Sequence, residues 1–308
     1  MRVGVVDLGT NSTRLLVADV EHGRVDELAR RTDITRLGEG VDERRVLLPL
    51  AIARVRNVLS EYRRELDGLS AERTLAVATS AVRDAENGEA FLGEVEWSYG
   101  FVTRLLTGDE EAALTFRGVS TGGELPAGTI VLDVGGGSTE LISEDARTSV
   151  DIGAVRLTER HLPSDPPTRD ELDAAAAAVR EVLPDLDPGA AVGVAGTITS
   201  LAALDLGLPE YDRDRVHGHR LNADGVAHQL DRLASLRLAE RRELPALEPE
   251  RAPVIVAGTV IVREVLARYQ LDALRVSERD ILHGAALEAA ALPPAEEGDA
   301  PPGAYTCC

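Results

Sequence analysis

The chain has 308 residues, of which 44% are hydrophobic and 28% charged, so it is long enough for two ordinary globular domains. Its formal net charge of −20, with no lysine at all, argues against general nucleic-acid binding, because polyanions are bound through positive surfaces. No apolar run is long enough to span a bilayer, and the adjacent Cys307 and Cys308 cannot brace a fold. We therefore expect a cytoplasmic protein without a membrane partner.

The predicted elements follow one plan twice. In the first half we expect strands at 2–8, 13–21 and 25–32, a helix at 50–66, a strand at 73–78, a helix starting in "TSAVRDAEN", a strand at 101–105 and a helix from Gly108. In the second half we expect strands at 129–134, 139–143 and 148–153, a helix at 168–183, a strand at 191–195, helices at 197–204, 221–235 and 252–269, a strand at 274–276 and a helix at 279–291. Hairpin strands followed by crossover helices predict a mixed α/β sheet in each half.

A sequence repeat supports the same division. "VVDLGTNSTRLLV" (Val5–Val17) returns as "VLDVGGGSTELIS" (Val131–Ser143), a whole domain length further along the chain. The repeat predicts duplicated α/β domains at 1–120 and 121–291 with a cleft between them. The proline-rich segment 292–308 is expected to be a disordered tail.

The repeated turn has the chemistry of a phosphate-binding site. Backbone N–H groups at a hairpin tip can point inward and form a concave site for an anion, and the run Gly135-Gly136-Gly137 lets a phosphate approach the main chain. Asp7 and Asp133 are compatible with phosphate only if a cation such as Mg²⁺ lies between them and the phosphate. A pair of such turns facing each other suits phosphoryl transfer.

The order of several motifs identifies a family resemblance. "DLGTNSTRL", "ATSAVRDAEN", "TGDEEA" and "DVGGGSTEL" resemble, in that order, segments of the exopolyphosphatase and guanosine pentaphosphate phosphatase family. "VAGTITSLAAL" (Val194–Leu204) resembles the adenosine motif of the larger superfamily of acetate and sugar kinases, heat-shock chaperones and actin. The resemblance covers roughly Met1 to Leu287 and implies ribonuclease H-like, actin-like ATPase domains, an Mg²⁺-dependent phosphoanhydride hydrolase and a homodimer.

The resemblance also implies roles for individual residues. Glu111 would activate the attacking water, with Glu110 as a rival one position earlier. The implied metal ligands are Asp133 and Glu140, with Asp7 as a third. The implied substrate-binding residues are Asn11, Ser12, Arg14, Arg83, Gly135, Gly136, Ser138, Gly196 and Thr197.

The sequence leaves the substrate open. The first choice is inorganic polyphosphate, hydrolysed from its end to release orthophosphate. Thr199 stands where many longer relatives carry a lysine, which favours short chains. Guanosine pentaphosphate is the alternative, because it also presents a terminal phosphoanhydride. An ATP-dependent small-molecule kinase and a non-catalytic phosphate or alarmone sensor are further alternatives.

Overall fold

The computed structural model describes residues 1–144 and 146–293, so most of the predicted tail at 292–308 lies outside the described residues. The chain divides into two compact units. Unit 1 comprises Met1–Gly123 together with the chain from Ile281, and unit 2 comprises Glu124–Asp280. In the described part of the chain, no helix combines the length and the apolar character that a membrane crossing requires.

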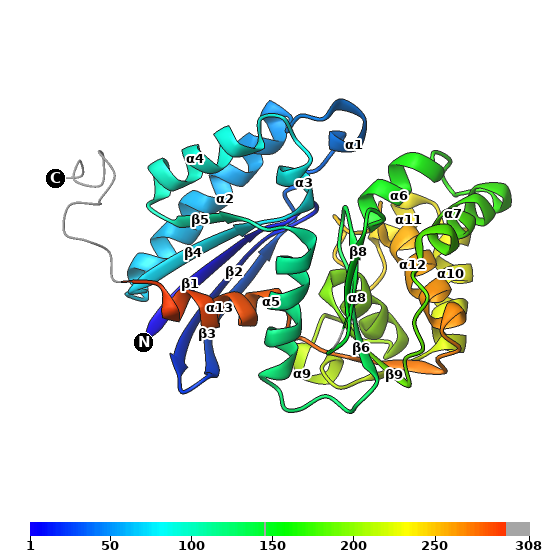
Figure 1. Ribbon diagram of the computed structural model, residues 1–308. Helices are drawn as coiled ribbons and strands as arrows, with labels where there is room; N and C mark the ends of the chain where they lie inside the picture. Colours follow the sequence, from blue (N-terminus) through cyan, green and yellow to red (C-terminus); the bar gives the residue numbers. More distant parts are fainter. Residues whose placement is uncertain (145, 294–308) are drawn as a thin grey trace. The chain divides into compact units, whose positions relative to one another are not determined.

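Unit 1 is built on a five-stranded sheet in the order β3-β2-β1-β4-β5 (Figure 1). Its first strands form an antiparallel meander, whereas β4 and β5 are added in parallel. The strands are β1 (Arg2–Leu8), β2 (Thr13–Glu21), β3 (Arg24–Asp33), β4 (Arg73–Ala78) and β5 (Val102–Leu105).

Helices cover both faces of this sheet. They are α1 (Val41–Arg44), α2 (Pro49–Gly68), α3 (Ser80–Arg83), α4 (Gly88–Tyr99), α5 (Gly108–Ser120) and α13 (Ile281–Ala291). Because side chains alternate along a strand, Val6 and Leu8 of β1 join one core cluster with Tyr62 of α2. Val3 and Val5 instead join a second cluster with residues of α5 and α13, which Figure 1 places side by side.

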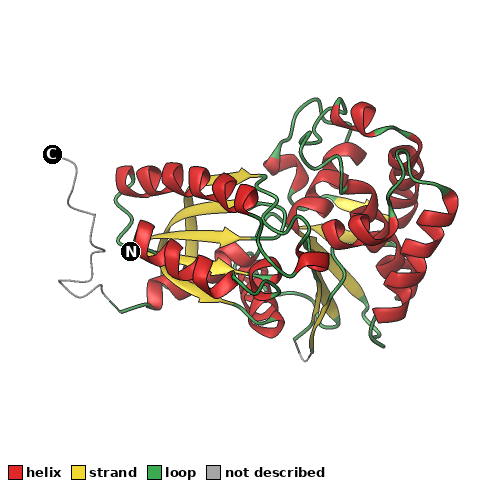
Figure 2. Ribbon diagram, turned by 90° about the horizontal axis from the view of Figure 1, so that it is seen from above, coloured by secondary structure: helices red, strands yellow, loops and turns green. Residues whose placement is uncertain are grey.

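Unit 2 contains a six-stranded sheet in the order β10-β11-β9-β6-β7-β8. The strands are β6 (Thr129–Val134), β7 (Thr139–Ile142), β8 (Arg147–Val150), β9 (Ala190–Val194), β10 (Arg220–Asn222) and β11 (Ala273–Val276). The helices, red in Figure 2, are α6 (Ala154–His161), α7 (Arg169–Val182), α8 (Ala195–Asp205), α9 (Arg213–Val216), α10 (Ala223–Ser235), α11 (Leu238–Arg242) and α12 (Ile255–Arg268). One large apolar cluster fills this unit.

The predicted duplication of an α/β unit is confirmed. The order β3-β2-β1-β4-β5 of unit 1 recurs in unit 2 as β8-β7-β6-β9-β11, with β10 as an additional edge strand. The repeated turns also share one hydrogen bond, since the N–H groups of Gly9 and Gly135 donate to the carbonyls of Ser12 and Ser138, each over 3.0 Å.

Of the expected domains 1–120 and 121–291, the first boundary lies within three residues of the observed one, but the carboxyl-terminal helix is assigned differently. The first boundary falls after Gly123, and α13 belongs to unit 1 instead of continuing unit 2. The physical reason is that α13 covers the open face of the first sheet, where Leu282 and Ala286 pack with Val3 and Val5 of β1. A division by sequence order alone misses this return of the chain.

Candidate active site

The candidate catalytic residues of unit 1 lie at the carboxyl ends of neighbouring parallel strands. Leu8, Ala78 and Leu105 are paired in register at the ends of β1, β4 and β5. The repeated turn follows the first of these strands, α3 with Arg83 follows the second, and α5 with Glu111 follows the third. Ligands of α/β sheets bind outside the carboxyl ends of strands, so a substrate is expected to bind at this edge of the sheet.

Glu111 lies in the first turn of α5 and is 11% exposed at its side chain. Its Oε2 lies 3.5 Å from Nη1 of Arg83, and the same nitrogen of Arg83 donates to the carbonyl of Leu106 over 2.8 Å. The guanidinium is therefore held at the base of α5 by a backbone contact. The structure thus brings together two of the residues that the sequence nominates.

Glu110, the alternative to Glu111 as the catalytic carboxylate, helps to cap the first turn of α5. Thr107 caps α5, and its hydroxyl accepts a hydrogen bond from the N–H of Glu110 while the Glu110 carboxylate accepts from the N–H of Thr107 over 2.8 Å. The carboxylate also accepts from Arg104. The bond from the Thr107 backbone is the main cause that lowers the pKa of Glu110. This geometry favours Glu111 as the chemically active carboxylate.

Asp7 and Arg14 contact each other. They face one another across β1 and β2, and Nε and Nη2 of Arg14 donate to Oδ2 of Asp7 over 2.8 and 2.6 Å. The Asp7 side chain is only 5% exposed, so the arginine balances a nearly buried negative charge. In the same turn Asn11 is buried and Ser12 is half-buried.

Unit 2 places a second carboxylate where unit 1 has the arginine. Asp133 and Glu140 face each other across β6 and β7, as Asp7 and Arg14 do in unit 1. Glu140 is fully buried and accepts a hydrogen bond from the hydroxyl of Ser149 over 2.8 Å. Like charges directly opposite each other in a sheet are unfavourable, so a cation near this pair would stabilise it.

The donor chemistry of this pair fits magnesium. Mg²⁺ is commonly held by one or two carboxylates, with waters and substrate oxygens completing its shell. Among the described residues, no group of three or more histidine, cysteine, aspartate or glutamate side chains forms a metal cluster.

The second predicted phosphate contact of unit 2 follows β9. Since β9 runs parallel to β6, with Val194 beside Asp133, the start of α8 lies next to the repeated turn of this unit. Gly196 has the guanidinium of Arg251 against it, because a Cβ at this glycine would lie 1.9 Å from Nη1. The side chain of Thr197 packs against Gly258 of α12.

Arg251 is a candidate that sequence reasoning missed. Its side chain is 15% exposed, and its Nε donates to Oε2 of Glu248 over 2.9 Å. The guanidinium is thus fixed at the glycine of the adenosine-like motif, where a cation suits an anionic ligand. Nothing in the local sequence around "ERAPVIV" distinguishes this arginine from a surface residue. Thr199 is buried in α8.

The chain is similar to known proteins in sequence and in structure. Residues 16–291 match the model of the Ppx/GppA phosphatase family. Exopolyphosphatase 2 of Mycobacterium tuberculosis is 40% identical over 94% of this chain and 98% of its own. The crystal structure of the Aquifex aeolicus family member superposes with a TM-score of 0.78 at 32% identity, covering 94% of this chain and 98% of that one. A guanosine-5'-triphosphate,3'-diphosphate pyrophosphatase of Vibrio atlanticus is 29% identical over 92% of this chain and 58% of its own. The chain belongs to the Ppx/GppA phosphatase family.

Proposed function

We propose that this protein is an exopolyphosphatase that hydrolyses the terminal phosphoanhydride of inorganic polyphosphate and releases orthophosphate. The observation that carries the proposal is the Glu111–Arg83 pair, held at a strand edge shared with an Asp-Gly-rich turn. The name of the Mycobacterium tuberculosis relative supports the choice of substrate.

Different groups of the chain have different roles in this reaction. The carboxylate of Glu111 orients the attacking water and accepts its proton as the oxygen attacks the terminal phosphorus. The positive charge of Arg83 stabilises the negative charge on the transferred phosphoryl group. Backbone N–H groups of the first repeated turn, in the same unit as Glu111 and Arg83, hold the phosphate oxygens and position the chain end. Such positioning and charge stabilisation supply most of the catalysis in phosphoryl transfer.

Mg²⁺ is proposed as the metal that serves this chemistry. Asp133 and the fully buried Glu140 would hold the ion. When bound, Mg²⁺ neutralises phosphate oxygens and so favours attack by water. A homodimeric state and a cytoplasmic location remain predictions from the sequence.

A pair of neighbouring glutamates gives a sharp test. In Glu111→Gln we expect kcat for phosphate release from tripolyphosphate to fall by roughly 10²- to 10⁴-fold, because the amide cannot accept the proton of water. The matched control is Glu110→Gln, whose amide oxygen keeps an acceptor for the cap of α5 and which should retain most of the activity. Equal losses in both variants, or full activity in Glu111→Gln, would contradict the role of Glu111. EDTA should abolish release, and added Mg²⁺ should restore it.

Guanosine pentaphosphate is the second candidate substrate. The Vibrio atlanticus relative supports it, and both substrates present the same terminal phosphoanhydride. Phosphate release from tripolyphosphate, long polyphosphate and guanosine pentaphosphate, measured side by side, separates the candidates. We expect the highest kcat/KM with the short polyphosphate, because Thr199 adds no cation for a long chain. A preference for guanosine pentaphosphate would replace the first proposal with the second.

A further inference from the structure

Thr10, in the first repeated turn, is held from three directions. Its hydroxyl lies 2.9 Å from the hydroxyl of Ser80, and its carbonyl accepts a hydrogen bond from the N–H of Gly38 over 2.8 Å. Its methyl group rests on the same glycine, since a Cβ at Gly38 would lie 2.3 Å from Cγ2. Thr10 and Ser80 are both buried. The turn is therefore fixed by two segments distant from it in the sequence.

The backbone contacts of the loop Arg36–Gly38 determine where the amides of the turn point. Besides the bond from Gly38, the N–H of Arg36 donates to the carbonyl of Asn11 over 2.9 Å. In a trans peptide the C=O and the following N–H point in opposite directions. The N–H groups of Asn11 and Ser12 are therefore directed away from the loop. Within residues 1–144 and 146–293, neither of these N–H groups donates a hydrogen bond to protein.

Unit 2 holds the carbonyl of Gly136, the equivalent of Thr10, with a different element, the start of α6. There the carbonyl of Gly136 accepts from the N–H of Val155 over 2.8 Å, and the carbonyl of Gly135 accepts from the N–H of Ala154 over 2.9 Å. Gly153 packs directly on the turn, since a Cβ there would lie 2.4 Å from the carbonyl carbon of Gly136. Two unrelated segments thus hold the equivalent carbonyls of Thr10 and Gly136, which indicates that the orientation of this one peptide group matters for both turns.

The backbone of the loop is itself conformationally unusual. Arg36 has a φ of 48°, in the left-handed region that residues with a Cβ seldom occupy. Such a conformation persists only where the surrounding contacts impose it, and it concentrates at functional sites. The strained residue is the one whose N–H holds the carbonyl of Asn11.

We propose that Arg36–Gly38, here called the brace loop, positions the first phosphate turn for the reaction. It directs the N–H groups of Asn11 and Ser12 toward the substrate phosphate, and the Thr10–Ser80 hydrogen bond keeps the turn in register with α3, which carries Arg83. Gly38 and Ser80 are positioning residues in this assignment, because neither needs to touch the substrate. The assignment rests on the proposed function for the identity of the ligand.

The test uses one added methyl group. Gly38→Ala places a Cβ against Cγ2 of Thr10, so the turn or the loop must shift. We expect kcat/KM for tripolyphosphate to fall by roughly 10- to 100-fold, since small misplacements of positioning groups have effects of this size. The Kd of tripolyphosphate, measured by calorimetry in the Glu111→Gln background, should rise in parallel. Gly93→Ala on α4 is the matched control, because a Cβ there meets nothing within 4 Å.

A rescue variant separates positioning from general damage. Thr10→Ser removes the crowded methyl group but keeps the hydroxyl for Ser80, so Gly38→Ala/Thr10→Ser should recover most of the lost affinity and kcat/KM. If Gly38→Ala does not fold, Thr10→Val, which keeps the shape but loses the hydroxyl, should weaken binding while Thr10→Ser alone does not.

The possible outcomes discriminate between the two proposals. Wild-type Kd and kcat/KM in Gly38→Ala would overturn the brace loop, as would a loss that follows a lowered melting temperature and that Thr10→Ser does not repair. If the wild-type protein binds tripolyphosphate but hydrolyses neither it nor guanosine pentaphosphate, the proposed function fails, and the Kd series still decides on the brace loop. Absence of tripolyphosphate binding to the wild-type protein would overturn both.

Discussion

Removal of one hydroxyl group, in Thr107→Ala, should weaken the start of the helix that carries Glu111. The hydroxyl accepts from the N–H of Glu110 over 3.2 Å, and it also donates to the Glu110 carboxylate over 3.0 Å. The bond from the Thr107 N–H to that carboxylate survives the substitution. Loss of an N-cap threonine costs about 1 kcal/mol of stability. If this whole energy is lost from the stabilisation of the transition state because Glu111 is less well positioned, kcat falls by about fivefold.

The chain contains its own control for this prediction. Thr168 and Glu171 form the same reciprocal cap at the start of α7 in unit 2, with a bond of 2.8 Å from the Thr168 N–H to the carboxylate. Thr168→Ala should therefore lower the free energy of unfolding by a similar amount, about 1 kcal/mol, but leave kcat unchanged. Urea unfolding followed by circular dichroism gives the stability, and phosphate release from tripolyphosphate gives kcat.

The stability and the kcat of both variants together test whether the Thr107 cap positions Glu111. Equal losses of stability with a fall in kcat only in Thr107→Ala would support the link between cap and base. Wild-type kcat in a Thr107→Ala protein that has lost the expected stability would refute it, because the cap would then contribute only to folding. Unchanged stability in both variants would refute the capping energies themselves.

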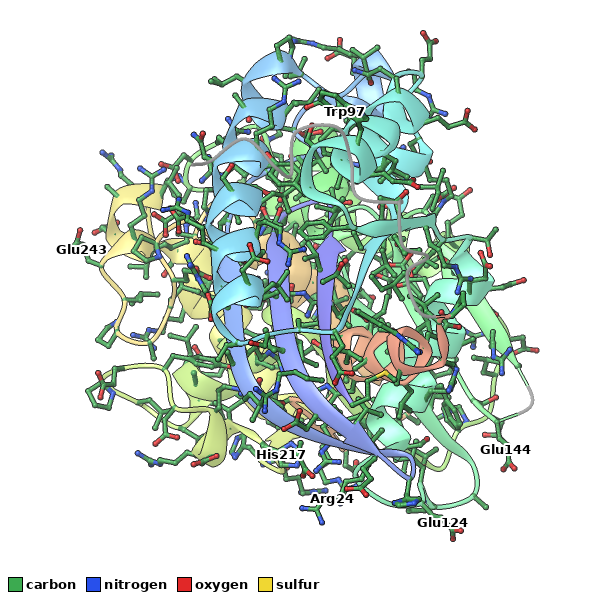
Figure 3. All side chains as sticks on the ribbon, turned by 90° about the vertical axis from the view of Figure 1, so that its left-hand side faces the viewer. Arg24, Trp97, Glu124, Glu144, His217 and Glu243 are labelled. Atoms are coloured by element: carbon green, nitrogen blue, oxygen red, sulfur yellow. The ribbon has the colours of Figure 1, made fainter. Side chains whose placement is uncertain are left out.

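The remaining predictions concern packing and pH. In Gly284→Ala the new Cβ would lie 1.9 Å from the carbonyl oxygen of Leu114 on α5. Urea unfolding should therefore show a free energy of unfolding about 1–3 kcal/mol lower than that of the Gly93→Ala control. A loss no larger than that of the control would argue against tight packing of α13 on α5. His217, labelled in Figure 3, accepts a hydrogen bond at Nδ1 from the N–H of Glu278, and partial burial, followed by the charge of Arg279, lowers its pKa below the usual 6.5. As the pH falls below 6.5, His217 binds a proton in the unfolded chain before it does so in the folded chain. The free energy of unfolding should therefore decline as the pH falls from above 6.5 toward the lower folded pKa of His217. His217→Asn keeps an acceptor and should flatten this decline, and identical pH profiles would exclude the contribution of His217.

Local patterns predicted much of the fold, and the family resemblance nominated Glu111 and Arg83, whose side chains the structure places 3.5 Å apart. The repeat around Asp7 and Asp133 indicated two units of one topology, and the structure reproduces it down to the Gly9–Ser12 and Gly135–Ser138 hydrogen bonds. These features depend on residues close together in the sequence, where turn chemistry and strand alternation act directly.

Other features depend on contacts between distant residues, which single-sequence patterns do not record. In the sequence the brace loop has the pattern of an ordinary turn, and only the structure shows that Gly38 packs against Thr10. Arg251 reads as a surface arginine until its guanidinium is found against Gly196. Sequence order predicts helix α13 in the second unit for the same reason. Its apolar pattern indicates that the helix is buried, but not which sheet it packs against.

The return of α13 to the first sheet has a consequence for synthesis. A ribosome that has made residues 1–123 has not yet made the helix that shields Val3 and Val5, because that helix begins at Ile281. The continuous segment 124–280 can mature first, so the usual order in which the amino-terminal body folds earlier is reversed here. Until the residues from Ile281 onward have been made, this nascent protein should expose an apolar sheet face to chaperones.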